Sequence, residues 1–128
     1  MLEIISTCPR TNTNSFELEE LCKKFNYKYI EIFPENQGFN SSEMKNILSD
    51  TEICIVGDDE VNKDVLIQCK KLKHIIKWGT GTDNIDLNYA NENNIKVHNT
   101  PNILGKYAAV KISIPESRLY CQNKGIVL

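Results

Sequence analysis

Apolar and polar residues follow two different periods along the first hundred residues, and these periods predict strands and helices in turn. Short apolar runs predict strands at Leu2–Ser6, Tyr27–Phe33, Ile53–Val56, His74–Trp78 and Ile95–His98. The run Tyr27–Phe33 alternates apolar and polar residues, which is typical of an edge strand. The run Ile53–Val56 is continuously apolar, as expected of a parallel strand buried on both faces.

Between the predicted strands, apolar residues recur at helical spacing. One apolar stripe at i, i+3, i+4 and i+7 consists of Leu18, Leu21, Cys22 and Phe25. This helix is predicted to begin at Asn14, which stands in capping-box spacing with Glu17. Further helices are predicted from Ser41 or Ser42 to Leu48, over Val61–Lys71, over Leu87–Asn94 with Asp86 as its cap, and over Ile103–Ile112.

Strands that alternate with helices predict an α/β fold with a parallel sheet. The natural arrangement is a flavodoxin-like three-layer sandwich, in which helices cover both faces of a five-stranded parallel sheet. In such folds ligands bind at the carboxyl ends of the strands, where the strand order reverses. The loops at those ends begin at Thr7, Pro34, Gly57, Gly79 and Asn99.

Composition narrows the class of protein. A chain of 128 residues suits one domain, and a net charge of −2 gives no electrostatic case for nucleic acid or an anionic membrane. The five cysteines are Cys8, Cys22, Cys54, Cys69 and Cys121. Their number is odd and no Cys-x-x-Cys occurs, which indicates buried thiols in a reducing compartment. No signal peptide or membrane-spanning run is predicted, so the expected location is the cytoplasm.

Candidate chemistry centres on the turn Gly79-Thr80-Gly81, which follows a predicted buried strand. Glycines let the backbone bend tightly and approach a ligand, so that main-chain N–H groups can face an anion such as a carboxylate. Taken alone, a Gly-x-Gly of this kind is more often a plain connection between a strand and a helix.

The residues around this turn form a more specific pattern. Leu72–Leu87 has the form Leu-Lys-x-Ile, then Gly-x-Gly-x-Asp-x-Ile-Asp, and Ile95–Pro101 has the form Ile-x-Val-x-Asn-Thr-Pro. This pattern resembles the substrate-binding (catalytic) domain of the D-isomer-specific 2-hydroxyacid dehydrogenases. The resemblance is good over residues 52–110 and looser before them. It implies a substrate-binding domain over residues 1–110 and a divergent tail over residues 111–128.

The resemblance implies roles for several residues. Gly79, Thr80 and Gly81 would offer N–H groups to the carboxylate of a small 2-hydroxy or 2-oxo acid, and Gly57 and Asp58 would form the neighbouring wall. Asp58 would repel the acid if it pointed inward. The favoured reading is that Asp58 and Asp59 cap the next helix. Asn99, Thr100 and Pro101 would form the crossover to a cofactor domain.

No catalytic residue and no metal ligand is assigned. In the resembled family the catalytic Arg, Glu and His belong to the cofactor domain, and His74 and His98 lie in no matching motif. Both histidines are therefore predicted to be structural. Cys8, beside Pro9 and Arg10, is a weaker suggestion of a reactive thiol at the rim of the site.

The intact family uses NAD(P), but this sequence contains no Gly-x-Gly-x-x-Gly, because Asn84 stands where the third glycine would fall. We therefore expect a truncated domain that binds the acid, binds no cofactor alone and is inactive alone. A homodimer or marginal stability is expected as well. The alternative is a non-catalytic module that binds a small carboxylate or another protein. A receiver-like domain is discounted, because Thr7-Cys8-Pro9 supplies no acidic residue after the first strand.

Overall fold

A computed structural model describes residues 2–79 and 81–99 of the chain. Its described part is a five-stranded, fully parallel sheet in the order β2-β1-β3-β4-β5. The strands are β1 (Leu2–Ser6), β2 (Tyr27–Glu31), β3 (Ile53–Val56), β4 (His74–Lys77) and β5 (Lys96–His98). The predicted flavodoxin-like sheet is confirmed, and β2 lies at an edge as its alternating pattern indicated.

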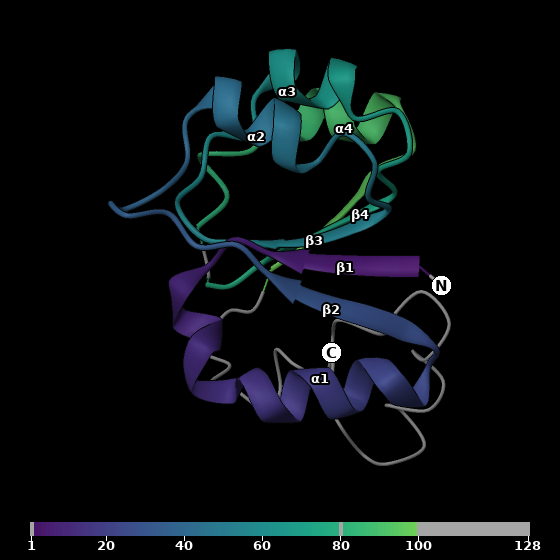
Figure 1. The fold of residues 1–128 in the computed structure, drawn as a ribbon. Helices are drawn as coiled ribbons and strands as arrows, with labels where there is room; N and C mark the ends of the chain where they lie inside the picture. Colours follow the sequence, from purple (N-terminus) through teal and green to yellow (C-terminus); the bar gives the residue numbers. More distant parts are fainter. Residues whose placement is uncertain (1, 80, 100–128) are drawn as a thin grey trace.

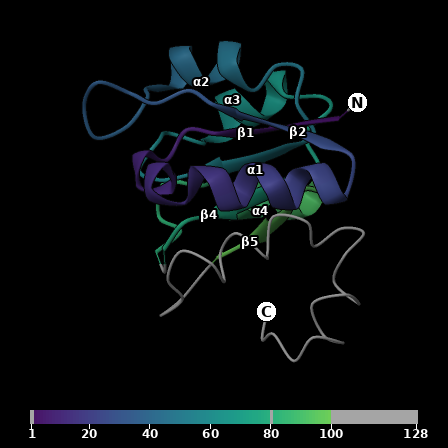
Figure 2. The same cartoon turned by 60° about the horizontal axis from the view of Figure 1, so that its bottom comes forward.

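Helices cover the two faces unequally. The connecting helices are η1 (Pro9–Asn14), α1 (Ser15–Lys24), α2 (Ser41–Ile47), α3 (Lys63–Gln68) and α4 (Leu87–Glu92). Helix α1 covers one face, while α2, α3 and α4 cover the other (Figure 1). The view turned by 60° shows α1 lying across the sheet in front of the strands (Figure 2).

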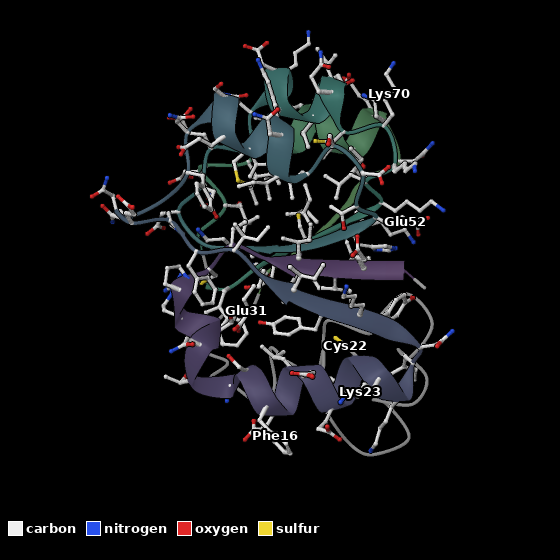
Figure 3. All side chains as sticks on the ribbon, viewed as in Figure 1. Phe16, Cys22, Lys23, Glu31, Glu52 and Lys70 are labelled. Atoms are coloured by element: carbon white, nitrogen blue, oxygen red, sulfur yellow. The ribbon has the colours of Figure 1, made fainter. Side chains whose placement is uncertain are left out.

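Both faces of the central strand are buried, as its continuous apolar run predicted. Cys54 and Val56 belong to the core beneath α2, α3 and α4, and Ile53 and Ile55 belong to the core beneath α1. All four side chains are buried. Side chains fill the space between each helical layer and the sheet, and Cys22 lies between α1 and the strands (Figure 3).

The predicted caps of the first two helices are wrong in detail. Asn14 stands at the start of α1, but its side chain makes no cap and instead donates to the Glu17 carboxylate at 3.1 Å. The 3₁₀ helix η1, predicted as a polar loop, runs directly into α1. The α2 cap is Asn40, which forms a full capping box with Glu43, whereas Ser41 donates to Glu60.

The third helix is shorter than the predicted Val61–Lys71. Val61 forms an isolated parallel bridge with Ile85 instead of a first helical turn. Asn62 then caps α3 by accepting the Val65 N–H at 3.2 Å. This correction moves Val61 out of the helix and into the segment that follows the carboxyl end of β3.

Candidate functional site

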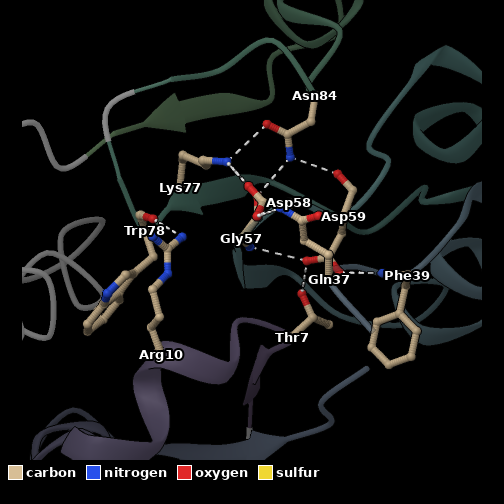
Figure 4. Close-up of polar contacts among 10 residues, drawn as sticks. All are labelled: Thr7, Arg10, Gln37, Phe39, Gly57, Asp58, Asp59, Lys77, Trp78 and Asn84. Carbon is tan, nitrogen blue, oxygen red and sulfur yellow. Dashed lines mark hydrogen bonds and ion pairs between the residues drawn. The ribbon is translucent and has the colours of Figure 1, made fainter. Parts of the chain in front are cut away.

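Three loops meet at the carboxyl ends of β1, β3 and β4. Their described residues are 7–10, 57–60, 78–79 and 81–84, and polar side chains from all three loops converge (Figure 4). The reversal of strand order falls beside β1 and β3, which is where open α/β sheets bind ligands. The described residues therefore place the predicted turn and the predicted wall at one edge of the sheet.

Lys77 ties two of these loops together from the last position of β4. Lys77 is 6% exposed, and its ammonium donates to the Gly57 carbonyl at 2.6 Å and to Asn84 Oδ1 at 3.1 Å. The Asn84 amide donates in turn to the carbonyls of Gly57, at 2.9 Å, and Asp59, at 2.7 Å. The loop after β3 is thus held through its main chain by two residues of the next strand and turn.

Asp59 is a buried acceptor and does not cap a helix, so the predicted capping role is wrong. Asp59 is 1% exposed, and its carboxylate accepts from the Thr7 hydroxyl at 2.6 Å, from the Phe39 N–H at 2.8 Å and from the Gly57 N–H at 3.2 Å. Donors surround the carboxylate, as burial of such a group requires. Asp59 therefore joins the loops that follow β1, β2 and β3.

Asp58 is not a helix cap either. Its side chain is exposed, lies 3.5 Å from the Lys77 ammonium and accepts from Gln37 at 3.4 Å. The Lys77 charge is therefore offset by a neighbouring carboxylate before any ligand arrives. This pairing also bears on the expected repulsion, because the negative charge of Asp58 is directed at Lys77.

The predicted anion-binding turn has one glycine that its backbone requires. Gly79 has φ +138°, a region that L side chains rarely adopt. Gly81 has open space around a hypothetical Cβ atom and no positive φ. Thr80 lies outside the described residues. Asp86 caps α4 by accepting the Tyr89 N–H at 3.0 Å, which confirms the predicted end of the turn.

Arg10 is a site residue that the sequence reasoning did not assign. One guanidinium nitrogen donates to the Trp78 carbonyl at 2.7 Å. The same nitrogen lies 3.7 Å from where a Cβ would stand on Gly57 and 3.9 Å from the corresponding point on Gly79. An exposed cation from η1 thus lies beside both loops to which the resemblance gives a role.

The remaining candidates lie elsewhere or are buried. Asn99 follows β5, whereas Thr100 and Pro101 lie outside the described residues, as does the tail 111–128. The His74 and His98 rings stack with centroids 5.7 Å apart and nitrogens 3.4 Å apart. They lie on the paired strands β4 and β5, within the sheet itself, and this geometry agrees with structural roles.

The four cysteines of the described part are free and buried. Cys8 is fully buried in the core beneath α1, so it is not an accessible thiol at the rim. Burial raises the pKa of Cys22 to about 12 and that of Cys69 to about 11, and it also raises the pKa of Cys54. Thiols held neutral in this way are poor nucleophiles.

Two further classes of site are not found in the described part. No group of three or more His, Cys, Asp or Glu side chains there could hold a metal ion. The described helices include none with the length and apolar character needed to cross a membrane.

Two open hollows lie beside β5, away from the turn at Gly79. One, of about 480 Å³, is bounded by α4 and β5 and includes His98. The other, of about 510 Å³, brings Lys70, Lys73 and Lys96 around His74. Neither is lined by Gly57, Lys77, Gly79 or Asn84.

Comparison with known proteins identifies the family to which the sequence is similar. Residues 11–109 match the model of the D-isomer specific 2-hydroxyacid dehydrogenase catalytic domain. A pig D-3-phosphoglycerate dehydrogenase is 41% identical over 69 residues, which are 53% of this chain and 13% of that protein. A putative 2-hydroxyacid dehydrogenase of Staphylococcus aureus strain USA300 is 40% identical over 58 residues, which are 45% of this chain and 18% of that protein.

Solved structures agree on the fold. The NAD+-bound 3-phosphoglycerate dehydrogenase of Entamoeba histolytica superposes with a TM-score of 0.68 at 24% identity, over 78% of this chain and 33% of that one. The D-lactate dehydrogenase of Aquifex aeolicus, complexed with NAD and lactic acid, superposes with a TM-score of 0.59 at 20% identity. This match covers 96% of this chain and 37% of that one. The matches thus span between about an eighth and two fifths of these longer proteins.

Proposed function

Because the chain belongs to the D-isomer specific 2-hydroxyacid dehydrogenase family by its catalytic domain, we propose that it binds a small 2-hydroxy or 2-oxo acid through the acid's carboxylate. The carboxylate lies against the turn at Gly79, Thr80 and Gly81, with Gly57 and Asp58 forming the neighbouring wall. Asn99, Thr100 and Pro101 lead towards a cofactor domain, as in the family. Hydride transfer with NAD(P) is proposed only for this domain acting together with such a cofactor domain.

One observation carries the proposal. Gly79 holds a backbone conformation that favours glycine, at the carboxyl end of β4, and the Arg10 guanidinium lies beside it. A main chain without a Cβ at this point lets N–H groups approach an anion, and a nearby cation adds attraction. The family match supplies the class of anion.

A nicotinamide dinucleotide does not fit the described turn. Asn84 stands where a dinucleotide-binding loop has its third glycine, and its amide is already engaged with the carbonyls of Gly57 and Asp59. Helix α4 begins only at Leu87, several residues beyond the glycines, so its N-terminus does not open directly from the turn. The proposal therefore assigns acid binding, and no redox step, to this chain's own residues.

The experiment uses Trp78, the single tryptophan of the chain, which adjoins Gly79 and is 8% exposed. Its fluorescence is titrated separately with pyruvate, glyoxylate, pyruvamide and NADH. Pyruvamide keeps the pyruvate skeleton but lacks the carboxylate. A saturable response to the two acids, with none to pyruvamide or NADH, supports the proposal. Equal responses to pyruvate and pyruvamide, or no saturable response to either acid, contradict it.

The proposal includes self-association and a cytoplasmic location. Several large apolar side chains are exposed, among them Phe16, which is 77% exposed and points away from the sheet on α1 (Figure 3). Exposed apolar surface favours association, although single residues of this kind are common. Sedimentation equilibrium of the wild type and of Phe16→Ser tests it. A monomer at all accessible concentrations contradicts this part of the proposal.

A further inference from the structure

We infer that Arg10 binds the acid's carboxylate and that, through its charge, the site selects monoanionic 2-oxo acids over dianionic ones. This inference rests on the proposed function, because it concerns the same turn. Arg10 lies just before the segment that matches the family model, which begins at residue 11. The geometry of this chain, and not the family match, therefore points to its role.

The first step is the position of the guanidinium. Arg10 reaches from η1 to the Trp78 carbonyl and lies beside Gly57 and Gly79 at once. Because both neighbours are glycines, no side chain separates the guanidinium from the main chain of either loop. An anion that receives N–H groups from the turn at Gly79 therefore lies within reach of Arg10.

The second step is the availability of its donors. Within the described residues, the Trp78 carbonyl is the one acceptor of the Arg10 side chain, and no carboxylate there forms an ion pair with it. A guanidinium presents several N–H donors in a planar fork that matches the two oxygens of a carboxylate. The contact with Trp78 fixes the side chain and leaves further donors for a ligand.

The third step is the balance of charge. The Lys77 ammonium is already matched by Asp58 at 3.5 Å. Asp59 adds a buried carboxylate satisfied by neutral donors, and Asp83 is exposed in the turn itself. Arg10 is thus the one cation of these three loops without a carboxylate partner among the described residues. A single negative charge matches it, whereas a second negative charge meets Asp58 or Asp83.

The experiment compares two acids with the same carbon skeleton. 2-Oxopentanoate carries one carboxylate, and 2-oxoglutarate differs from it by a second, distal carboxylate. Dissociation constants for the full chain are measured by isothermal titration calorimetry and by Trp78 fluorescence, at low and at moderate salt. We expect 2-oxopentanoate to bind at least about tenfold more tightly. The preference should weaken at higher salt, because screening reduces repulsion between exposed charges.

Three variants separate charge from shape. Arg10→Gln should weaken the binding of 2-oxopentanoate by about 10- to 100-fold, which is the usual effect of losing a hydrogen bond to a charged group. Arg10→Lys keeps the charge and should retain the preference with weaker binding. Asp58→Asn removes a repelling charge and releases Lys77, so it should improve 2-oxoglutarate binding more than 2-oxopentanoate binding. Lys70 is also an exposed cation but lies far from the turn, so Lys70→Gln should change the affinity for neither acid.

The possible outcomes are distinguishable. Equal binding of the two acids, or tighter binding of 2-oxoglutarate, overturns the selection while the proposed function stands. If Arg10→Gln binds 2-oxopentanoate with wild-type affinity, the role of Arg10 is overturned and the proposed function still stands. If neither acid binds, the proposed function fails and this inference fails with it.

Discussion

The ammonium of Lys77 donates to the main-chain carbonyl of Gly57 at 2.6 Å, so the last residue of β4 fastens the first residue of the loop after β3. The contact reaches from Lys77, which pairs with Val56 at the end of the β3–β4 ladder, to the residue that follows Val56. It is nearly removed from water, since Lys77 is 6% exposed. The two loops that would hold the acid are therefore held to each other before any acid binds.

Lys77→Met should destabilise the fold by about 2–3 kcal/mol, because it removes charged hydrogen bonds to two acceptors and leaves the Gly57 carbonyl with fewer donors. Urea unfolding followed by Trp78 fluorescence and circular dichroism measures the change. Lys70→Met is the matched control, since Lys70 is exposed, and it should stay within about 0.5 kcal/mol of the wild type. Equal effects of the two changes would show that Lys77 does not fasten the loops.

Asp59→Ala should lower the free energy of unfolding by about 3 kcal/mol, because the buried Thr7 hydroxyl and the N–H groups of Phe39 and Gly57 lose their acceptor. Asp83→Ala removes an exposed carboxylate and should be nearly neutral. Thermal and urea unfolding of both variants test the difference. A stability of Asp59→Ala equal to that of the wild type would mean that water replaces the carboxylate without cost.

Gly79→Ala should destabilise the chain by about 1–3 kcal/mol, because an L side chain is strained at φ +138°. It should also weaken pyruvate binding, since the main chain of the turn must shift. Gly81→Ala meets open space and should leave stability unchanged within about 0.5 kcal/mol. Unfolding curves and fluorescence titrations of the pair check both effects. An unaffected Gly79→Ala would remove the main support for the turn as an anion site.

Gly38→Ala should also be costly, for a different reason. A Cβ on Gly38 would stand 2.6 Å from the Asp58 carbonyl oxygen, and this neighbour is main chain that cannot rotate away. The loop after β2 would have to leave the loop after β3, at a cost of about 1–3 kcal/mol. Amide hydrogen exchange should then speed up at Glu60, whose N–H donates to the Phe39 carbonyl, and at Phe39, whose N–H donates to the Asp59 carboxylate. Unchanged exchange at both amides would contradict this packing.

Stability should fall in alkaline solution, in part because of the buried thiols. The folded-state pKa values of Cys22, about 12, and Cys69, about 11, lie above the ordinary value of 9.0. A raised folded pKa gives a contribution that is complete below about pH 9 and is lost as the pH rises towards 11 and 12, because only the unfolded thiols ionise there. The double variant Cys22→Ala, Cys69→Ala should show a shallower decline in unfolding free energy over this range. Parallel pH curves for the two proteins would count against this cause.

The sequence predicts the sheet well because its signals are local. The run Leu2–Ser6 is a strand with those same bounds, and Asp86 caps its helix as its position before Leu87 indicated. Helix starts are less predictable where several polar residues compete, since Asn40 and Asn62 cap where serines or aspartates were expected. In each case the competing side chain finds a distant partner: Ser41 binds Glu60, and Asp59 binds Thr7.

The candidate site is predictable only in its main-chain parts. The glycine turn is visible in the sequence, because two glycines after a buried strand form a local signal. Arg10 and Lys77 are not, because their partners are distant in sequence: Arg10 contacts Trp78, 68 positions away, and Lys77 contacts Gly57, 20 positions away. Their roles depend on the strand order, which brings these loops together.

Asn84 and Lys77 hold the loop after β3 through its carbonyl groups, and a carbonyl is the same for every residue type. The side chain at position 58 can therefore be exchanged while the loop keeps its shape. During divergence from a common ancestor, a single codon change at that position would alter the charge beside the proposed acid site without requiring a new scaffold. If the proposed site holds an acid, a lineage that keeps Asn84 and Lys77 can thus change which acid it binds by small, separately tolerated steps.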